Sequence, residues 1–93
     1  MVFAVEFEYD SIKDAVNLSK HGVPLAVGRI VIENRIADVR DPRDYGEVRR
    51  IAYGLVKGRM FVCVYTLRGQ TCRLISVRKA NSREQKQWLP LPR

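Results

Sequence analysis

The chain is poor in side chains that bind metals or form disulfides. Its 93 residues include only two cysteines, Cys63 and Cys72, and one histidine, His21. Two cysteines are too few for a disulfide framework, and their spacing fits no zinc-binding pattern. A bond between them would need neighbouring strands and an oxidising compartment, which nothing else in the sequence indicates. We therefore expect a cytoplasmic protein with no structural metal and no cofactor.

Long apolar runs and nucleotide-binding motifs are also missing. No stretch approaches the roughly 20 apolar residues that a membrane span needs. Residues 1–6 contain no basic segment and already include an acid, Glu6, so they do not resemble a signal peptide. Gly-x-Gly-x-x-Gly, Walker and His-Glu-x-x-His motifs are absent. The length leaves room for one domain, residues 1–93.

The net charge is +7, and acidic residues are scarce in the second half of the chain. Residues 1–48 hold six Lys/Arg and nine Asp/Glu, whereas residues 49–93 hold eleven Lys/Arg and one acid, Glu84. Such an excess of like charge opposes compaction. A polyanionic partner offsets it and gains affinity by releasing counterions. The charge pattern favours a nucleic-acid partner over a merely soluble surface or a membrane-surface protein.

The first half predicts a strand followed by helices. Residues 2–7 form a β-type run. A helix is expected over residues 11–21, with Asp10 or Ser11 as N-cap and Gly22 just past its end.

Pro24 can begin a second short helix that continues to Val31. Its β-branched residues leave a strand as the alternative. Residues 40–46 are rich in turn formers and predict a loop.

The second half predicts a three-stranded antiparallel meander over residues 49–56, 59–66 and 71–77. Lys57-Gly58 is a hairpin signal between the first two strands. A final helix is expected over residues 83–89, capped by Asn81 or Ser82. The fold class is therefore α+β, an antiparallel sheet with helices on one side and arginines on the other.

Arginines and lysines supply the only recognisable cluster of chemistry. Alternation along residues 73–79 places Arg73 on one face of its strand and Arg78 on the other, until twist changes the register. Guanidinium groups over a sheet can hold a phosphate and stabilise a pentacoordinate transition state. RNA can be cut in this way without a metal, because its 2′-OH is the nucleophile. This hypothesis requires the arginines to gather in one place and not to pair mainly with the protein's own carboxylates.

Several residues have both a functional and a structural interpretation. His21 is either a proton-transfer group or a residue favoured at a helix C-terminus. Glu84 is a base or, as we favour, the ion-pair partner of Arg73 or Arg83. Tyr65 stacks on a base or fills the core. Trp88 is expected to anchor a helix.

The opening Tyr9-Asp10-x-x-Lys13-x-x-x-Asn17-x-x-Lys20-His21-Gly22 resembles that of BrnT-type toxins. The second half is similar to the same family at further positions, namely Glu47-x-Arg49, Gly58-Arg59, Val64-Tyr65-Thr66, Arg68-Gly69 and Arg73-x-Ile75-Ser76-x-Arg78-Lys79-Ala80.

The resemblance implies a small RelE-like domain with metal-independent endoribonuclease activity. It also implies neutralisation in a hetero-oligomer by a BrnA-type ribbon-helix-helix antitoxin, through which alone the protein reaches operator DNA. The catalytic candidates that it carries over are His21, Lys20, Arg49, Arg73 and Arg78. The substrate-binding candidates are Tyr65, Lys79, Arg68 and Arg59.

Two other hypotheses stay open. Composition supports a non-catalytic nucleic-acid-binding module equally well, and favours binding over cleavage. The third hypothesis is an interaction protein whose basic sheet docks an acidic partner.

Overall fold

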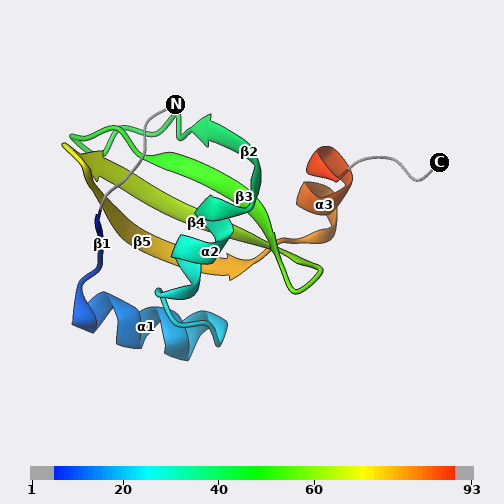
Figure 1. Cartoon of the computed structure of the whole chain (residues 1–93), viewed down its shortest axis with the longest axis horizontal. Helices are drawn as coiled ribbons and strands as arrows, with labels where there is room; N and C mark the ends of the chain where they lie inside the picture. The colour runs from blue at the N-terminus through cyan, green and yellow to red at the C-terminus, as the bar shows by residue number, and fades with distance from the viewer. Residues whose placement is uncertain (1–5, 90–93) are drawn as a thin grey trace.

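One five-stranded sheet organises the computed structural model, which describes residues 6–89 (Figure 1). The elements are, in chain order, β1 (Glu6–Glu8), α1 (Ser11–His21), α2 (Val27–Glu33), β2 (Arg35–Arg40), β3 (Arg50–Val56), β4 (Arg59–Arg68), β5 (Thr71–Lys79) and α3 (Ser82–Trp88). The strands lie in the order β1-β5-β4-β3-β2. β1 pairs with β5 in parallel, and the other pairings are antiparallel. The α+β class is confirmed, but the sheet is mixed, so the prediction of a purely antiparallel sheet is wrong.

Local capping sets the bounds of α1. The Asp10 carboxylate accepts hydrogen bonds from the backbone N–H groups of Ile12 and Lys13, at 2.7 and 3.1 Å. Gly22 has a left-handed backbone (φ 72°), and its N–H donates to the Leu18 carbonyl at 2.8 Å. These are the cap and the stop that the sequence predicts, and the helix over residues 11–21 is confirmed.

The segment after Pro24 is helical, as the first of the two alternatives predicts, although α2 itself begins at Val27. Leu25, which precedes α2, and Val31, which lies within it, are fully buried. The helix approaches β3 at backbone distance, because a Cβ at Gly54 would lie 2.2 Å from the Val31 carbonyl oxygen. Only glycine at position 54 allows this contact.

The meander is confirmed, with β4 and β5 each extending two residues beyond the predicted ends. The Lys57-Gly58 hairpin turn has positive φ at both residues, 50° and 78°, as a two-residue hairpin requires. β2 was not predicted. It is an edge strand that pairs with β3.

The helices cover both faces of the sheet. α1 and α2 pack on the face of Ala52, Cys63 and Leu74. α3 packs on the opposite face, here called the α3 face, which carries Tyr53, Met60 and Val62. The rings of Trp88 and Tyr53 lie 5.2 Å apart. The expectation that all helices share one side is therefore wrong, whereas the packing role of Trp88 is confirmed.

The side chain of Asn17 hydrogen-bonds to the backbone edge of β5 beyond the point where β1 ends. Its amide nitrogen donates to the carbonyls of Val23 and Val77, at 2.8 and 2.9 Å, and its oxygen accepts from the Val77 N–H at 3.1 Å. A buried backbone edge without partners is costly. Asn17 takes the place of a neighbouring strand and joins α1 to the sheet.

A β-bulge in β5 changes which side chains share a face. Tyr65 is opposite Leu74, but its neighbour Val64 is opposite Ser76, so Ile75 is the extra residue. Leu74 and Val77 consequently lie in the same core, and Arg73 and Arg78 both lie on the α3 face. Strict alternation predicts opposite faces for the two arginines, which is wrong beyond the bulge.

Both cysteines are free and buried, so the pairing that the sequence left open does not form. Burial raises the pKa of the Cys72 thiol to about 11. None of the helices over residues 6–89 has the length and apolar character that a membrane crossing requires. Most of the strand predicted over residues 2–7 lies outside the described residues.

Candidate nucleic-acid interface

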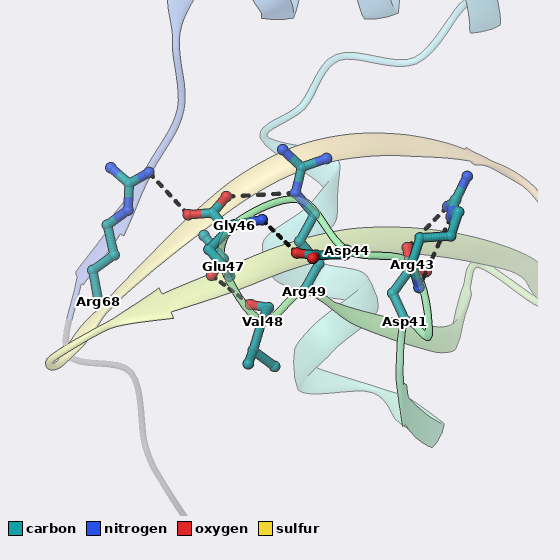
Figure 2. A network of polar contacts seen from close by, with 9 residues as sticks. Asp41, Arg43, Asp44, Gly46, Glu47, Val48, Arg49 and Arg68 are labelled. Carbon is teal, nitrogen blue, oxygen red and sulfur yellow. Dashed lines mark hydrogen bonds and ion pairs between the residues drawn. The ribbon is translucent and has the colours of Figure 1, made fainter.

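Glu47 joins two of the predicted arginines at one end of the sheet. Its carboxylate lies 3.4 Å from Nε of Arg49 and 3.3 Å from a terminal nitrogen of Arg68 (Figure 2). The two contacts, that of Arg68 first, hold the pKa of Glu47 below its ordinary value. Thr66 fixes the loop beside them, because its hydroxyl donates to the Val48 carbonyl at 2.8 Å.

Arg73 belongs to the same region of the α3 face. It pairs in the sheet with Thr66, next to the loop that carries Arg49. Its guanidinium lies 3.4 Å from the carboxylate of Glu8, a half-exposed side chain of β1. Arg49, Arg68 and Arg73 form what we call the cationic end of the α3 face.

The sequence did not single out Tyr45, which lies against this cluster. The guanidinium carbon of Arg49 is 3.9 Å from the centre of its ring, and that of Arg43 is 5.3 Å away. Tyr45 as a whole residue is nevertheless 40% exposed. An exposed aromatic between cations is a surface on which a nucleobase can stack. The signal was available in the spacing Arg43-x-Tyr45-x-x-x-Arg49, inside a segment read only as a loop.

A hollow of about 480 Å³ opens beside Glu47. The loop before β3 forms its walls, through Arg40, Asp41, Pro42, Arg43, Asp44, Gly46, Glu47 and Val48. Asp41 is buried and fixes the loop by accepting two hydrogen bonds from the Arg43 guanidinium, at 3.0 and 2.9 Å (Figure 2).

Arg78 is held apart from the cationic end. Its guanidinium makes two contacts of 2.8 Å with the carboxylate oxygens of Glu84. Glu84 also completes the capping box of α3 with Asn81. The interpretation of Glu84 as an ion-pair partner is confirmed, but the partner is Arg78 and not Arg73 or Arg83. Arg78 thereby ties α3 to β5.

Replacing Glu84 with glutamine should destabilise the protein at neutral pH by about 1.5 kcal/mol, the low end of the range for hydrogen bonds to charged groups, because the Arg78 side chain is 38% exposed. The Arg78 guanidinium lowers the pKa of Glu84 below its ordinary 4.5. A lowered carboxyl pKa stabilises the fold above that ordinary value, and the stabilisation disappears as the pH falls through the folded-state pKa. Glutamine can keep the capping box, but it loses the charge and one of the two oxygens that accept from Arg78.

Thermal unfolding of the two proteins at neutral and acid pH tests this. The difference in unfolding free energy should vanish well below pH 4.5. Glu33→Gln is the control, because Glu33 forms an exposed pair with Arg29 and should change little. Equal stabilities at neutral pH, or a difference that persists in acid, contradict the assignment.

Lys20 and His21 lie elsewhere, in the last turn of α1. They line a groove between α1 and β5 that also includes Ser76. In β5, Ser76 lies between Arg73 and Arg78. The groove thus brings the predicted proton-transfer residues beside the strand that carries two of the predicted arginines.

Tyr65 is 4% exposed and packs in the core, so no ring face is open to a base in this structure. Its hydroxyl donates to Asp38. Burial, followed by that carboxylate, raises the pKa of Tyr65. Asp38 also pairs with Arg50 and Arg35, at 2.8 and 3.2 Å. This cluster joins β2, β3 and β4 beneath α2.

Lys79 and Arg59 do not share the cationic end. Lys79 is opposite Phe61 and Arg59 is opposite Val56, both of which pack in the core under α1 and α2. The two cations are exposed at the far end of the sheet. Their predicted role in binding substrate therefore belongs to a different surface from that of Arg49.

The arginines meet the requirement of the nuclease hypothesis in part. Three of them gather at one end, but each of Arg49, Arg68, Arg73 and Arg78 contacts a carboxylate of the protein itself. The first three contacts are single and 3.3–3.4 Å long. Pairs of this kind contribute little free energy and exchange readily for a phosphate. Of these four arginines, only Arg78 forms a bidentate and short pair, with Glu84.

No three His, Cys, Asp or Glu side chains within residues 6–89 gather closely enough to ligate a metal ion. The chemistry at the cationic end of the α3 face is that of guanidinium groups, the exposed Tyr45 and carboxylates. Together with the net charge of +7, the fold and this cluster define a small basic α+β protein with guanidinium groups gathered at one end of its sheet.

The chain matches the model of the family described as "Ribonuclease toxin, BrnT, of type II toxin-antitoxin system" over residues 9–84. It therefore belongs to this family, as the sequence resemblance indicates. Membership makes it a ribonuclease toxin, whose class has an RNA target and an antitoxin partner. No curated protein matches the chain.

Proposed function

We propose that this chain is an endoribonuclease of RelE-like fold that cleaves RNA without a resident metal ion. The 2′-oxygen attacks the adjacent phosphorus, the bond to the 5′-oxygen breaks, and the products end in a 2′,3′-cyclic phosphate and a 5′-hydroxyl. A base takes the proton of the 2′-OH, and an acid gives one to the departing 5′-oxygen. The cationic end of the α3 face is the observation that carries this proposal.

Arg49 and Arg73 bind the scissile phosphate and stabilise the charge of the transition state, with Arg68 beside them. Glu47 orients Arg49 and Arg68 in this proposal. Its lowered pKa makes it a poor proton acceptor at neutral pH.

His21 is the proton-transfer group of this proposal, with Lys20 beside it. Both line the groove between α1 and β5 and not the cationic end of the α3 face, so the proposal requires an RNA that reaches around the edge of β5. Arg78 has a different part, because its bidentate contact with Glu84 ties α3 to the other end of β5. Lys79 and Arg59 contact RNA outside the cleavage site. The exposed ring of Tyr45 replaces that of Tyr65 as the surface for a nucleobase.

We also propose that a BrnA-type ribbon-helix-helix antitoxin neutralises the protein in a cytoplasmic hetero-oligomer. Operator DNA is reached only through that antitoxin.

A defined RNA incubated with the purified protein and a chelator tests the activity. We expect cleavage, and fragment ends that carry 2′,3′-cyclic phosphate and 5′-hydroxyl groups. Cleavage that the chelator abolishes overturns the metal-free mechanism, and 3′-hydroxyl ends overturn attack by the 2′-oxygen.

A second candidate is a non-catalytic nucleic-acid-binding protein. All four arginines contact carboxylates of the protein itself, which leaves fewer preformed donors for a transition state and favours binding without cleavage. Salt-dependent binding of the same RNA with no cleavage supports this alternative.

A further inference from the structure

Large apolar side chains are exposed along one face of α1. Ile12 is 74% exposed and Val16 is 58% exposed. Residues four apart in a helix lie on the same face, so the two side chains form one ridge. Ile75 of β5 faces them across the groove described above. This surface is aliphatic, and none of the three side chains belongs to a core cluster of the described residues.

Two lysines, Lys13 and Lys20, place positive charge beside the ridge. Lys13, Lys20 and His21 line the same groove, and its lining within the described residues includes no Asp or Glu. The groove has a volume of about 220 Å³. Its chemistry is therefore apolar in the middle and cationic at the rim.

The edge of β5 forms the floor of the groove. β1 pairs with β5 only as far as Arg73, and beyond it α1 lies along the strand. Asn17 holds α1 there through both backbone groups of Val77. The groove is thus built on a helix that is fixed to the sheet, and a partner finds it preformed.

From this geometry we propose that the groove between α1 and β5 binds an acidic amphipathic segment of the antitoxin. The segment places apolar side chains on Ile12, Val16 and Ile75, and its Asp and Glu residues face Lys13 and Lys20. An amphipathic helix in an apolar groove is a common mode of peptide recognition, and opposite charges accelerate its association. The proposal rests on the proposed function only in naming the antitoxin of this toxin as the partner.

RNA fits this groove less well than a protein segment does. Nucleobases stack on aromatic rings and guanidinium planes, and these lie with Tyr45 and Arg49. Isoleucine and valine offer neither a ring nor a hydrogen bond. A docked segment also covers Lys20 and His21, so binding there blocks the proposed proton transfer directly.

The test uses the full-length toxin and the protein encoded by the reading frame next to its gene. Calorimetry compares the parent with an Ile12→Gln, Val16→Gln variant, since glutamine keeps the helix propensity. We expect the variant to bind at least about tenfold more weakly, as the loss of two apolar anchors implies. Thermal unfolding should show that the variant is folded, since neither side chain belongs to the buried core.

Matched changes separate this surface from the rest of the protein. Leu18→Gln alters another exposed apolar residue of α1 outside the groove and should leave affinity unchanged. Lys13→Glu should weaken binding, whereas Lys86→Glu on α3 should not. Hydrogen exchange should show new protection in α1 and around Ile75 on binding.

Parental affinity of the double variant overturns the proposal, as does the absence of any complex with the neighbouring gene product. If the parent forms the complex with this pattern but cleaves no RNA, the docking site stands and the nuclease proposal fails.

Discussion

Replacing Arg49 with alanine should lower the rate of RNA cleavage by about 10²–10³-fold and leave the fold intact. Removing one preformed donor to the charge of a transition state has an effect of this size. Arg49 is the arginine best prepared for that role, because Tyr45 supports its guanidinium plane and Glu47 fixes its Nε. Single-turnover cleavage of a defined RNA measures the effect, and thermal unfolding confirms the fold.

Two further variants serve as controls for the Arg49→Ala result. Arg49→Lys keeps the charge but loses the planar group that stacks on Tyr45, so we expect it to recover only part of the activity. Arg29→Ala removes an equally charged side chain from an exposed pair on α2, and its activity should match the parent. Full activity of a folded Arg49→Ala protein would remove the cationic end of the α3 face from the mechanism.

Gly54→Ala should destabilise the protein by about 3 kcal/mol, at the upper end of the range for overpacked cores. The added Cβ would lie 2.2 Å from the Val31 carbonyl oxygen and 3.2 Å from the backbone carbon of Asn34. These are backbone atoms, so no side-chain rotation relieves the contact, and α2 must move away from β3. Chemical denaturation measures the loss in unfolding free energy.

Gly22→Ala is the matched control, because its Cβ would meet nothing within 4 Å. That substitution is penalised only through the left-handed backbone at φ 72°, by about 1 kcal/mol. A Gly54→Ala protein that is no less stable than the Gly22→Ala protein contradicts the close packing of α2 on β3.

Elements with local signals could be predicted from the sequence. α1 has Asp10 at its start and Gly22 at its end, and Lys57-Gly58 specifies a hairpin by backbone conformation alone. β2 lacks such a signal. Its sequence mixes charged and apolar residues with neither a regular alternation nor a long apolar run, and it is held by the contacts of Asp38 with Arg50 and Tyr65. Those contacts join residues far apart in the chain.

The charge of the second half was visible in the sequence, but its partners were not. Much of it is balanced within the chain, because Glu8, Asp38 and Glu47 of the acidic first half contact arginines of the second. The bulge at Ile75 was equally hidden, since it depends on the cross-strand register of β4 and β5. It decides which arginines share a face.

The parallel pairing of β1 with β5 has a consequence for synthesis on the ribosome. Glu6–Glu8 leave the exit tunnel more than sixty residues before their partners Thr71–Arg73. Contacts between such distant segments form late in folding. The nascent toxin therefore completes its sheet, and brings Glu8 to Arg73, only after β5 has been translated. Before that point the growing chain does not carry the assembled cationic surface.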